Sequence, residues 1–163
     1  MALSSSEIID TTGIRVNKGA CVVIVRTEWN AAIIDLLEKG CVEVLEKHKV
    51  KYEVVNVPGA FEIMFGIKDY WNNHRKKKKP SAFIALGCVL KGDTPHFDYV
   101  SKAVTDGIVQ LNLSLPVPTI FGVLTVNTQE QADERTGGRH GNKGAEAAAT
   151  ALKMISLSQS FRK

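Results

Sequence analysis

The chain has 163 residues, which is the size of a single domain and enough to bury a core of two or three layers. Its 44% hydrophobic and 23% charged residues exclude a disordered chain, and no apolar run is long enough to predict a membrane span. The net charge of +4 owes much to the basic run RKKKK at residues 75–79. We interpret this run as a solvated loop. A nucleic-acid patch is the weaker alternative, because no aromatic residues are interleaved with it.

The N-terminal residues 1–13 show no signal-peptide or transit pattern. We expect them to form an arm ahead of a single domain at residues 14–163, in a protein of the cytoplasm. Within the arm, Ile8 and Ile9 fit either an edge strand or a flexible segment. The three cysteines, Cys21, Cys41 and Cys88, lack CxxC spacing, so we expect core thiols in a reducing compartment and no zinc site.

Short β-branched runs alternate with helical patterns along the chain. Strands are expected at residues 20–25, 51–57, 81–90 and 117–124. Helices are expected at residues 33–44, 60–71, 96–111, 128–135 and 145–155, with a glycine-rich loop at 136–144. This alternation predicts an α/β fold, a three-layer αβα sandwich with a four-stranded parallel sheet of the flavodoxin-like type. An extra N-terminal edge strand is an option.

The stretch ALGCVLKGDTPHFDYV at residues 85–100 is the most informative. An apolar run predicts a strand buried on both faces, and Thr94-Pro95 predicts a helix start, with the threonine hydroxyl as cap. Free N–H groups at a helix N-terminus favour an anion, and Gly92 would let the backbone approach it, so we expect a phosphate there. His96 in the first turn is a candidate general base. The alternative is a histidine that only hydrogen-bonds the helix cap.

The other loops at the carboxyl ends of the strands add an aromatic residue with an amide, Trp29-Asn30, and a turn with a carboxylate, Gly59 to Glu62. Ligands bind at this edge of a parallel sheet. Together the loops can stack a flat ring, hydrogen-bond a polyol and hold a phosphate. Taken singly, Trp29 could be a buried core residue, and Glu62 could be a solvated carboxylate in the first turn of the following helix. Their joint occurrence at the strand ends favours a binding site.

Five blocks of sequence resemble the lumazine synthase family in order and spacing, over about residues 14–157: VPGAFEIM, ALGCVLKGDTPHFDYV, FGVLT, EQADERTGG and GNKGAEAA. The resemblance implies a transferase of riboflavin biosynthesis, 6,7-dimethyl-8-ribityllumazine synthase. This activity condenses 5-amino-6-(D-ribitylamino)uracil with 3,4-dihydroxy-2-butanone 4-phosphate through an imine, with release of inorganic phosphate and ring closure. The resemblance implies no metal and no organic cofactor.

The resemblance also implies roles for individual residues. Trp29 would stack on the pyrimidine. Further contacts to ring and ribityl chain would come from Asn30, Gly59, Ala60, Phe61, Glu62, Val89 and Leu90. The phosphate ligands would be Gly92, Asp93, Thr94 and Arg135. His96 would transfer protons, with Glu146 as a carboxylate that orients or charges it. Phe121 and Lys143 would close the site from the adjacent subunit.

The partners implied by the resemblance are the small-molecule substrates, further copies of the chain and, as a candidate, riboflavin synthase, with no nucleic acid and no membrane. Family members form homopentamers, some of which pack into sixty-subunit capsids. Two residues depart from the common pattern: Trp29 stands where phenylalanine is common, and Met64 where proline is frequent. The basic loop also looks a few residues longer than usual.

Other functions stay open at this point: a non-catalytic homologue that binds riboflavin or another flavin in the same cleft, a flavodoxin-like electron carrier, or a shell protein, which could coexist with catalysis. His96, Arg135 and Lys143 argue against the first two, because a carrier needs no proton-transfer residue.

Overall fold

The computed structural model describes residues 9–74 and 79–162. Strands and helices alternate in the order β1 (Cys21–Thr27), α2 (Ala31–Lys47), β2 (Lys51–Val57), the short 3-10 helix η1 (Ala60–Glu62), α3 (Ile63–Asn73), β3 (Ala82–Leu90), α4 (His96–Ser114), β4 (Thr119–Val126), α5 (Gln129–Glu134), β5 (Thr136–Gly138), β6 (Gly141–Asn142) and α6 (Lys143–Ser160). Of the predicted strands, 51–57 has the expected bounds, and the other three differ by one or two residues at their ends.

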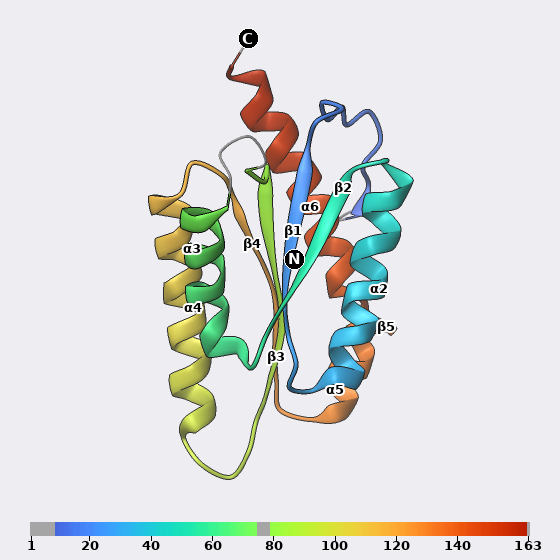
Figure 1. The fold of residues 1–163 in the computed structure, drawn as a ribbon. Coiled ribbons are helices and arrows are strands. Elements are labelled where there is room, and N and C mark those ends of the chain that lie inside the picture. Colours follow the sequence, from blue (N-terminus) through green and yellow to red (C-terminus); the bar gives the residue numbers. More distant parts are fainter. Residues whose placement is uncertain (1–8, 75–78, 163) are drawn as a thin grey trace.

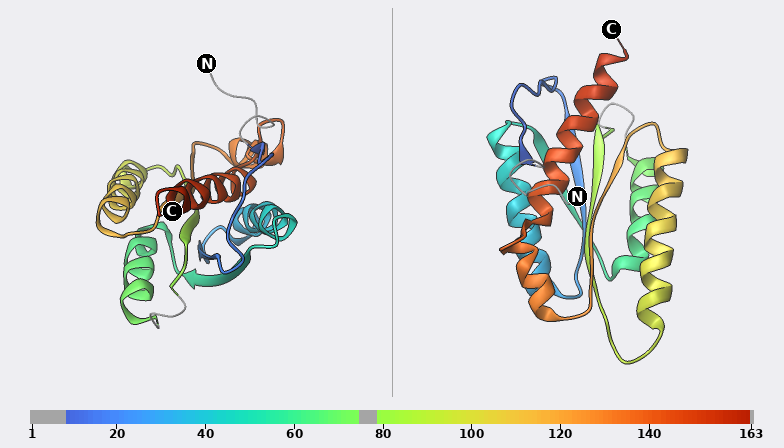
Figure 2. Two further views of the ribbon diagram at one scale, coloured as in Figure 1. Left: turned by 90° about the horizontal axis from the view of Figure 1, so that it is seen from above. Right: turned by 180° about the vertical axis from the view of Figure 1, so that it is seen from behind.

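The four long strands form a parallel sheet in the order β2-β1-β3-β4. Helices α3 and α4 cover one face, and α2 and α6 cover the other, as Figure 1 shows from the side and Figure 2 from above. This arrangement confirms the predicted three-layer α/β fold of the flavodoxin-like type.

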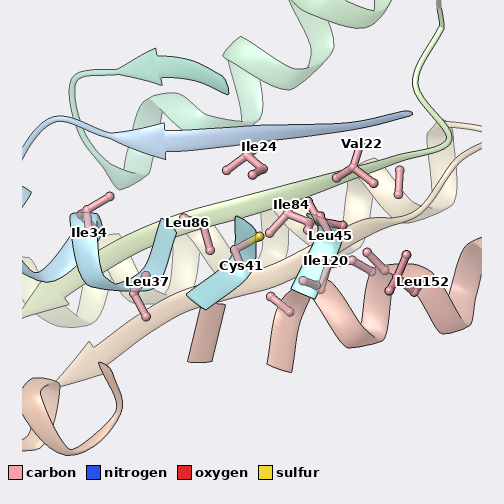
Figure 3. Close-up of a cluster of buried hydrophobic side chains, with 14 of the residues drawn as sticks. Val22, Ile24, Ile34, Leu37, Cys41, Leu45, Ile84, Leu86, Ile120 and Leu152 are labelled. Atoms are coloured by element: carbon pink, nitrogen blue, oxygen red, sulfur yellow. The ribbon is translucent and has the colours of Figure 1, made fainter. Parts of the chain in front are cut away.

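Two apolar clusters hold the layers together, one on each face of the sheet. Figure 3 shows the cluster under α2 and α6, where Leu37 and Cys41 of α2 and Leu152 of α6 pack on Ile84 and Leu86 of β3. Strand β3 contributes to both clusters, and only its last residue is more than slightly exposed. The sequence at 81–90 is thus almost entirely apolar because this central strand is covered on both faces.

Helices α2 and α6 approach each other closely at Gly144. A Cβ atom there would lie 1.8 Å from the carbonyl oxygen of Leu37, so only glycine fits this contact. The thiols of Cys41 and Cys88 are buried, while Cys21 is only half-buried, and all three are free. Burial raises the pKa of the Cys88 thiol to about 11, so this thiol is protonated at neutral pH and a weak nucleophile.

The glycine-rich segment 136–144, expected as a loop, instead contains the small antiparallel pair β5 and β6 and the first residues of α6. Thr136 pairs with Asn142, and Gly137 and Gly141 adopt positive φ angles of 125° and 75°. The loop expectation was wrong because strands of two and three residues carry no alternating pattern. We call residues 136–142 the hairpin.

The N-terminal arm and the basic run are described only in part. Ile8 and the rest of residues 1–8 lie outside the described residues, and among residues 9–20 none lies in a strand. Thr11 joins the end of α2, with its hydroxyl 2.7 Å from Nε2 of His48. Residues 75–78 also lie outside the described part, and Lys79 lies 4.6 Å above the ring centre of Trp71. Within residues 9–74 and 79–162, no helix is both long and apolar enough to span a membrane.

Candidate active site at the strand ends

The parallel register brings the predicted site loops to one end of the sheet. Thr27 lies opposite Val57 at the ends of β1 and β2, and Leu90 lies opposite Val126 at the ends of β3 and β4. These ends and the loops that follow them are at the lower end of Figure 1, where the β3–α4 connection projects furthest. The C-terminus lies at the opposite end of the molecule.

Trp29 is 65% exposed, so it is not the core residue that its size alone would suggest. Its backbone N–H donates to the carbonyl of Pro58 at 3.1 Å, which joins the loop after β1 to the loop after β2. Its indole lies over Gly59, where a Cβ atom would come within 2.5 Å of two ring atoms. The position of the indole therefore requires glycine at 59, and the exposed part of the ring could stack on a flat ligand.

Asn30 begins α2 in the left-handed region, at φ 60° and ψ 40°, a conformation that asparagine tolerates better than most residues. Its side-chain Nδ2 donates to the carbonyl oxygen of Cys88 at 3.1 Å, which fixes the loop after β1 to β3. Val89 and Leu90 then end β3, the first buried and the second half-buried. Asn30 thus has a structural role besides any contact to a ligand.

Glu62 is half-buried, and its Oε2 accepts a hydrogen bond of 3.1 Å from the backbone N–H of Gly59. Gly59 has no side chain to return the bond, so this is only half of a capping box. Ala60 is buried and Phe61 is 59% exposed. Trp29, Asn30 and residues 59–62 thus form one surface, which we call the ring-side group.

The segment 91–96, which we call the anion loop, is exposed throughout and lies at the start of α4. The expected hydroxyl cap of Thr94 is wrong. The N-cap is Pro95, whose carbonyl accepts from the N–H groups of Asp98 and Tyr99, and no side chain of the described residues caps the helix. Pro95 already has helical φ and ψ angles, so the first hydrogen bonds of the helix come from its carbonyl and Thr94 is left outside.

This start leaves backbone donors open. Toward the described residues, no hydrogen bond is donated by the N–H groups of Gly92, Asp93, Thr94, His96 and Phe97. An anion at a helix N-terminus would satisfy such donors. Gly92 has no positive φ, and a Cβ atom there would meet nothing within 4 Å, so the chain itself does not require this glycine. The Asp93 and His96 side chains face solvent, and the His96 side chain has no hydrogen-bond partner among the described residues.

Arg135, Lys143 and Glu146 form a second cluster, which we call the cation group. Oε2 of the buried Glu146 lies 3.2 Å from Nη2 of Arg135 and 3.4 Å from Nζ of Lys143. Nη1 of Arg135 also donates to the carbonyl of His140 at 2.7 Å. Among the described residues of one chain, the partners of the Glu146 carboxylate are therefore the two cations. Its role in orienting His96 stays a prediction.

A cavity of about 720 Å³ opens along β4, the edge strand of the sheet. Phe121, Arg135 and Lys143 line it, while Trp29, Glu62 and His96 do not. Among the described residues, no hydrogen bond or ion pair joins the cation group to the ring-side group or to His96. The residues predicted for one site thus fall into two sets within a single chain.

Sequence reasoning missed six polar or charged side chains of this cavity: Thr125, Glu130, Gln131, Glu134, Arg139 and His140. Oε2 of Glu134 lies 3.1 Å from Nε of Arg139 and 3.4 Å from Nε2 of His140. For Arg139 and His140, the available signal was their place between the glycines of the hairpin, and Glu134 directly precedes Arg135 in the sequence. In the described part of the chain, this cavity included, no group of three His, Cys, Asp or Glu side chains is placed to hold a metal ion.

A parallel sheet with aromatic, carboxylate and open N–H groups at its carboxyl ends defines a flavodoxin-like protein, a class in which small ligands bind at that edge. Residues 19–159 match the family model described as 6,7-dimethyl-8-ribityllumazine synthase. The chain belongs to this family, as the sequence predicted.

Relatives that carry the same name support this assignment. The chain is 51% identical over 138 residues to that of Parabacteroides distasonis, which covers 83% of this chain and 84% of the relative. The values are 49% over 143 residues for Bacteroides fragilis, covering 86% and 97%, and 46% over 151 residues for Porphyromonas gingivalis, covering 91% of each. The prediction of an enzyme with this activity is confirmed at the level of the family.

Proposed function

We propose that this chain makes 6,7-dimethyl-8-ribityllumazine from 5-amino-6-(D-ribitylamino)uracil and 3,4-dihydroxy-2-butanone 4-phosphate, with release of inorganic phosphate. The observation that carries the proposal is the family match over residues 19–159, which spans all the predicted site residues. The amine and carbonyl that react both belong to the substrates. The protein therefore has to position them and move protons.

The ring-side group would bind the uracil. The exposed indole of Trp29 offers a broad π face, and Glu62 keeps one carboxylate oxygen besides the one bonded to Gly59. Oδ1 of Asn30 and the backbone of residues 59–61 can hydrogen-bond the ribityl chain, beside Val89 and Leu90 at the end of β3.

The anion loop and Arg135 would bind the phosphate. The open N–H groups of the anion loop and of Phe97, and the planar guanidinium, all suit a phosphate group. His96 is exposed at the start of α4, free to reach a substrate and to transfer a proton. Glu146 would then hold Arg135 and Lys143 in place before the substrate arrives.

The proposal includes a site shared by two copies of the chain. One copy would give the ring-side group and the anion loop, and its neighbour would give the cation group and Phe121. Two observations support this: the cavity along β4 holds the cations without any ring-side residue, and large apolar side chains are exposed at Trp29, Phe61, Phe65, Tyr99 and Leu113. Repeating one head-to-tail contact closes a ring.

For this ring the family resemblance favours a homopentamer, with a sixty-subunit capsid and association with riboflavin synthase as further candidates. We place the enzyme in the cytoplasm, where its three free cysteines suit a reducing compartment.

The test is to incubate the purified protein with both substrates and to follow lumazine fluorescence and inorganic phosphate together. We expect both to rise at equal rates, and neither to rise when one substrate is omitted. A protein that binds riboflavin but forms neither product would be the non-catalytic homologue instead.

A further inference from the structure

Asn142 lies between the two cations along the hairpin. Arg135 directly precedes Thr136, the partner of Asn142 in the β5–β6 pair, and Lys143 directly follows Asn142. The backbone N–H of Lys143 also donates to the carbonyl of Arg135 at 2.8 Å. A shift of Asn142 would therefore move both cations of the cation group.

The side-chain amide of Asn142 makes three hydrogen bonds, each to a different part of the fold. Nδ2 donates to the carbonyl of Leu36 in α2 at 2.9 Å and to the carbonyl of Thr136 across the hairpin at 3.2 Å. Oδ1 accepts from the N–H of Ala145 at 3.0 Å and so caps α6. The amide thus ties the hairpin to α2 as well as capping a helix.

Gly40 makes the room that this tie needs. A Cβ atom at Gly40 would lie 2.4 Å from both Cγ and Oδ1 of Asn142. Such a distance is well inside van der Waals contact, so alanine at 40 would push the amide out of its place. The side chain at 142 is held between α2, the hairpin and the start of α6, and it is the link through which the position of α2 fixes the hairpin.

We propose that Asn142 is a positioning residue for phosphate binding, which acts by anchoring the hairpin to α2 and thereby holding Arg135 and Lys143 at the cavity along β4. This inference rests on the proposed function for the identity of the phosphate substrate. An asparagine that only caps α6 would affect stability and leave the relative affinities for the two substrates unchanged.

The experiment uses two independent substitutions. Asn142→Ser keeps a neutral capping oxygen for α6 but is too short to reach Leu36, and Gly40→Ala displaces the amide while leaving Asn142 in the sequence. Asn112→Ser is the matched control. The side chain of Asn112 also makes three hydrogen bonds, away from both cations. Its Nδ2 donates to the carbonyls of Ile108 and Thr119, and its Oδ1 accepts from the N–H of Thr119.

We expect Asn142→Ser and Gly40→Ala each to raise KM for the butanone phosphate about ten- to a hundredfold, with KM for the uracil within about twofold of wild type. Asn112→Ser should change neither KM, even if it lowers Tm as much. Combining Asn142→Ser with Arg135→Lys should add less than the two separate effects, because both act through the same guanidinium.

Protection by inorganic phosphate separates this inference from the proposed function. If the wild-type protein makes no product, phosphate should still raise its Tm, and by much less in Asn142→Ser and Gly40→Ala than in Asn112→Ser. Equal rises in both KM values, unchanged KM values, full additivity with Arg135→Lys, or equal protection in all variants would each overturn the positioning role.

Discussion

The ring-side group and the cation group reach the same kind of precision by different means. Trp29 and Glu62 are held mainly through the backbone: a loop-to-loop hydrogen bond, a glycine under the indole and one N–H to the carboxylate. Arg135 and Lys143 are held by the buried carboxylate of Glu146. Flat contact surfaces can thus be placed by strand ends, whereas long flexible cations need a fixed counter-charge.

Because of this buried counter-charge, substitutions in the cation group should cost more stability than substitutions in the ring-side group. Glu146 is almost completely buried, and its Oε1 finds no hydrogen-bond partner among the described residues. A buried carboxylate of this kind depends on its cations, so removing one of them costs more than the pair itself contributes. The ring-side group contains no such pair, and its residues should tolerate substitution with smaller losses of stability.

His96, in the anion loop, should give the largest effect on catalysis. We expect His96→Ala to lower turnover about ten- to ten-thousandfold, because proton transfer is lost while both neighbouring groups stay in place. Substrate affinities should be largely kept, as measured by titration of each substrate separately. Unchanged turnover would remove His96 from the mechanism.

Arg135→Lys tests the cation group alone. Lysine keeps the charge but loses the planar fork, so KM for the butanone phosphate should rise about ten- to a hundredfold and KM for the uracil much less. Arg15→Lys, an exposed arginine far from these residues in sequence, is the control for the change of residue type. A parallel rise of both KM values would make Arg135 a packing residue.

Gly59→Ala tests the ring-side group alone. The new methyl would collide with the indole of Trp29, and displacing the ring should raise KM for the uracil about three- to tenfold, with KM for the phosphate substrate kept. Gly19→Ala is the matched control, since a Cβ atom there meets nothing within 4 Å. Kinetics like those of the control would mean that the indole can move aside without loss.

The smallest effect is spectroscopic. Riboflavin or a substrate analogue should quench tryptophan emission in the wild-type protein and much less in Trp29→Leu, where the half-buried Trp71 remains as an internal reference. Equal quenching in both proteins would place the ring elsewhere.

The fold was predictable from the sequence because its elements are long and periodic. The apolar run at 81–90 and the apolar positions of the helix expected at 96–111 each reflect burial, which the pattern of apolar residues shows directly. Helix α4 starts at His96 as expected, but its cap was misjudged by one residue, since Thr94-Pro95 fits the pattern of a hydroxyl cap whether or not the hydroxyl reaches an N–H.

The cation group was less predictable. The spacing of Lys143 and Glu146 is visible as a helical pair, but the contact of Glu146 with Arg135 depends on a hairpin whose strands are too short to leave a pattern. The tie between Asn142 and Leu36 spans 106 residues and depends on the absence of a side chain at Gly40. Contacts of this kind follow from packing between elements, which local sequence does not encode.

The separation of the two groups within one chain makes a direct test possible. His96→Ala and Arg135→Ala subunits, each expected to have low activity alone, are mixed, unfolded and refolded together, and the mixed assemblies are verified by mass before assay. If each site is shared, some interfaces pair an intact His96 with an intact Arg135, and activity should return to a fraction set by the mixing ratio. Mixed assemblies that are no more active than their parents would contradict the shared site and place both residues in a site within one chain.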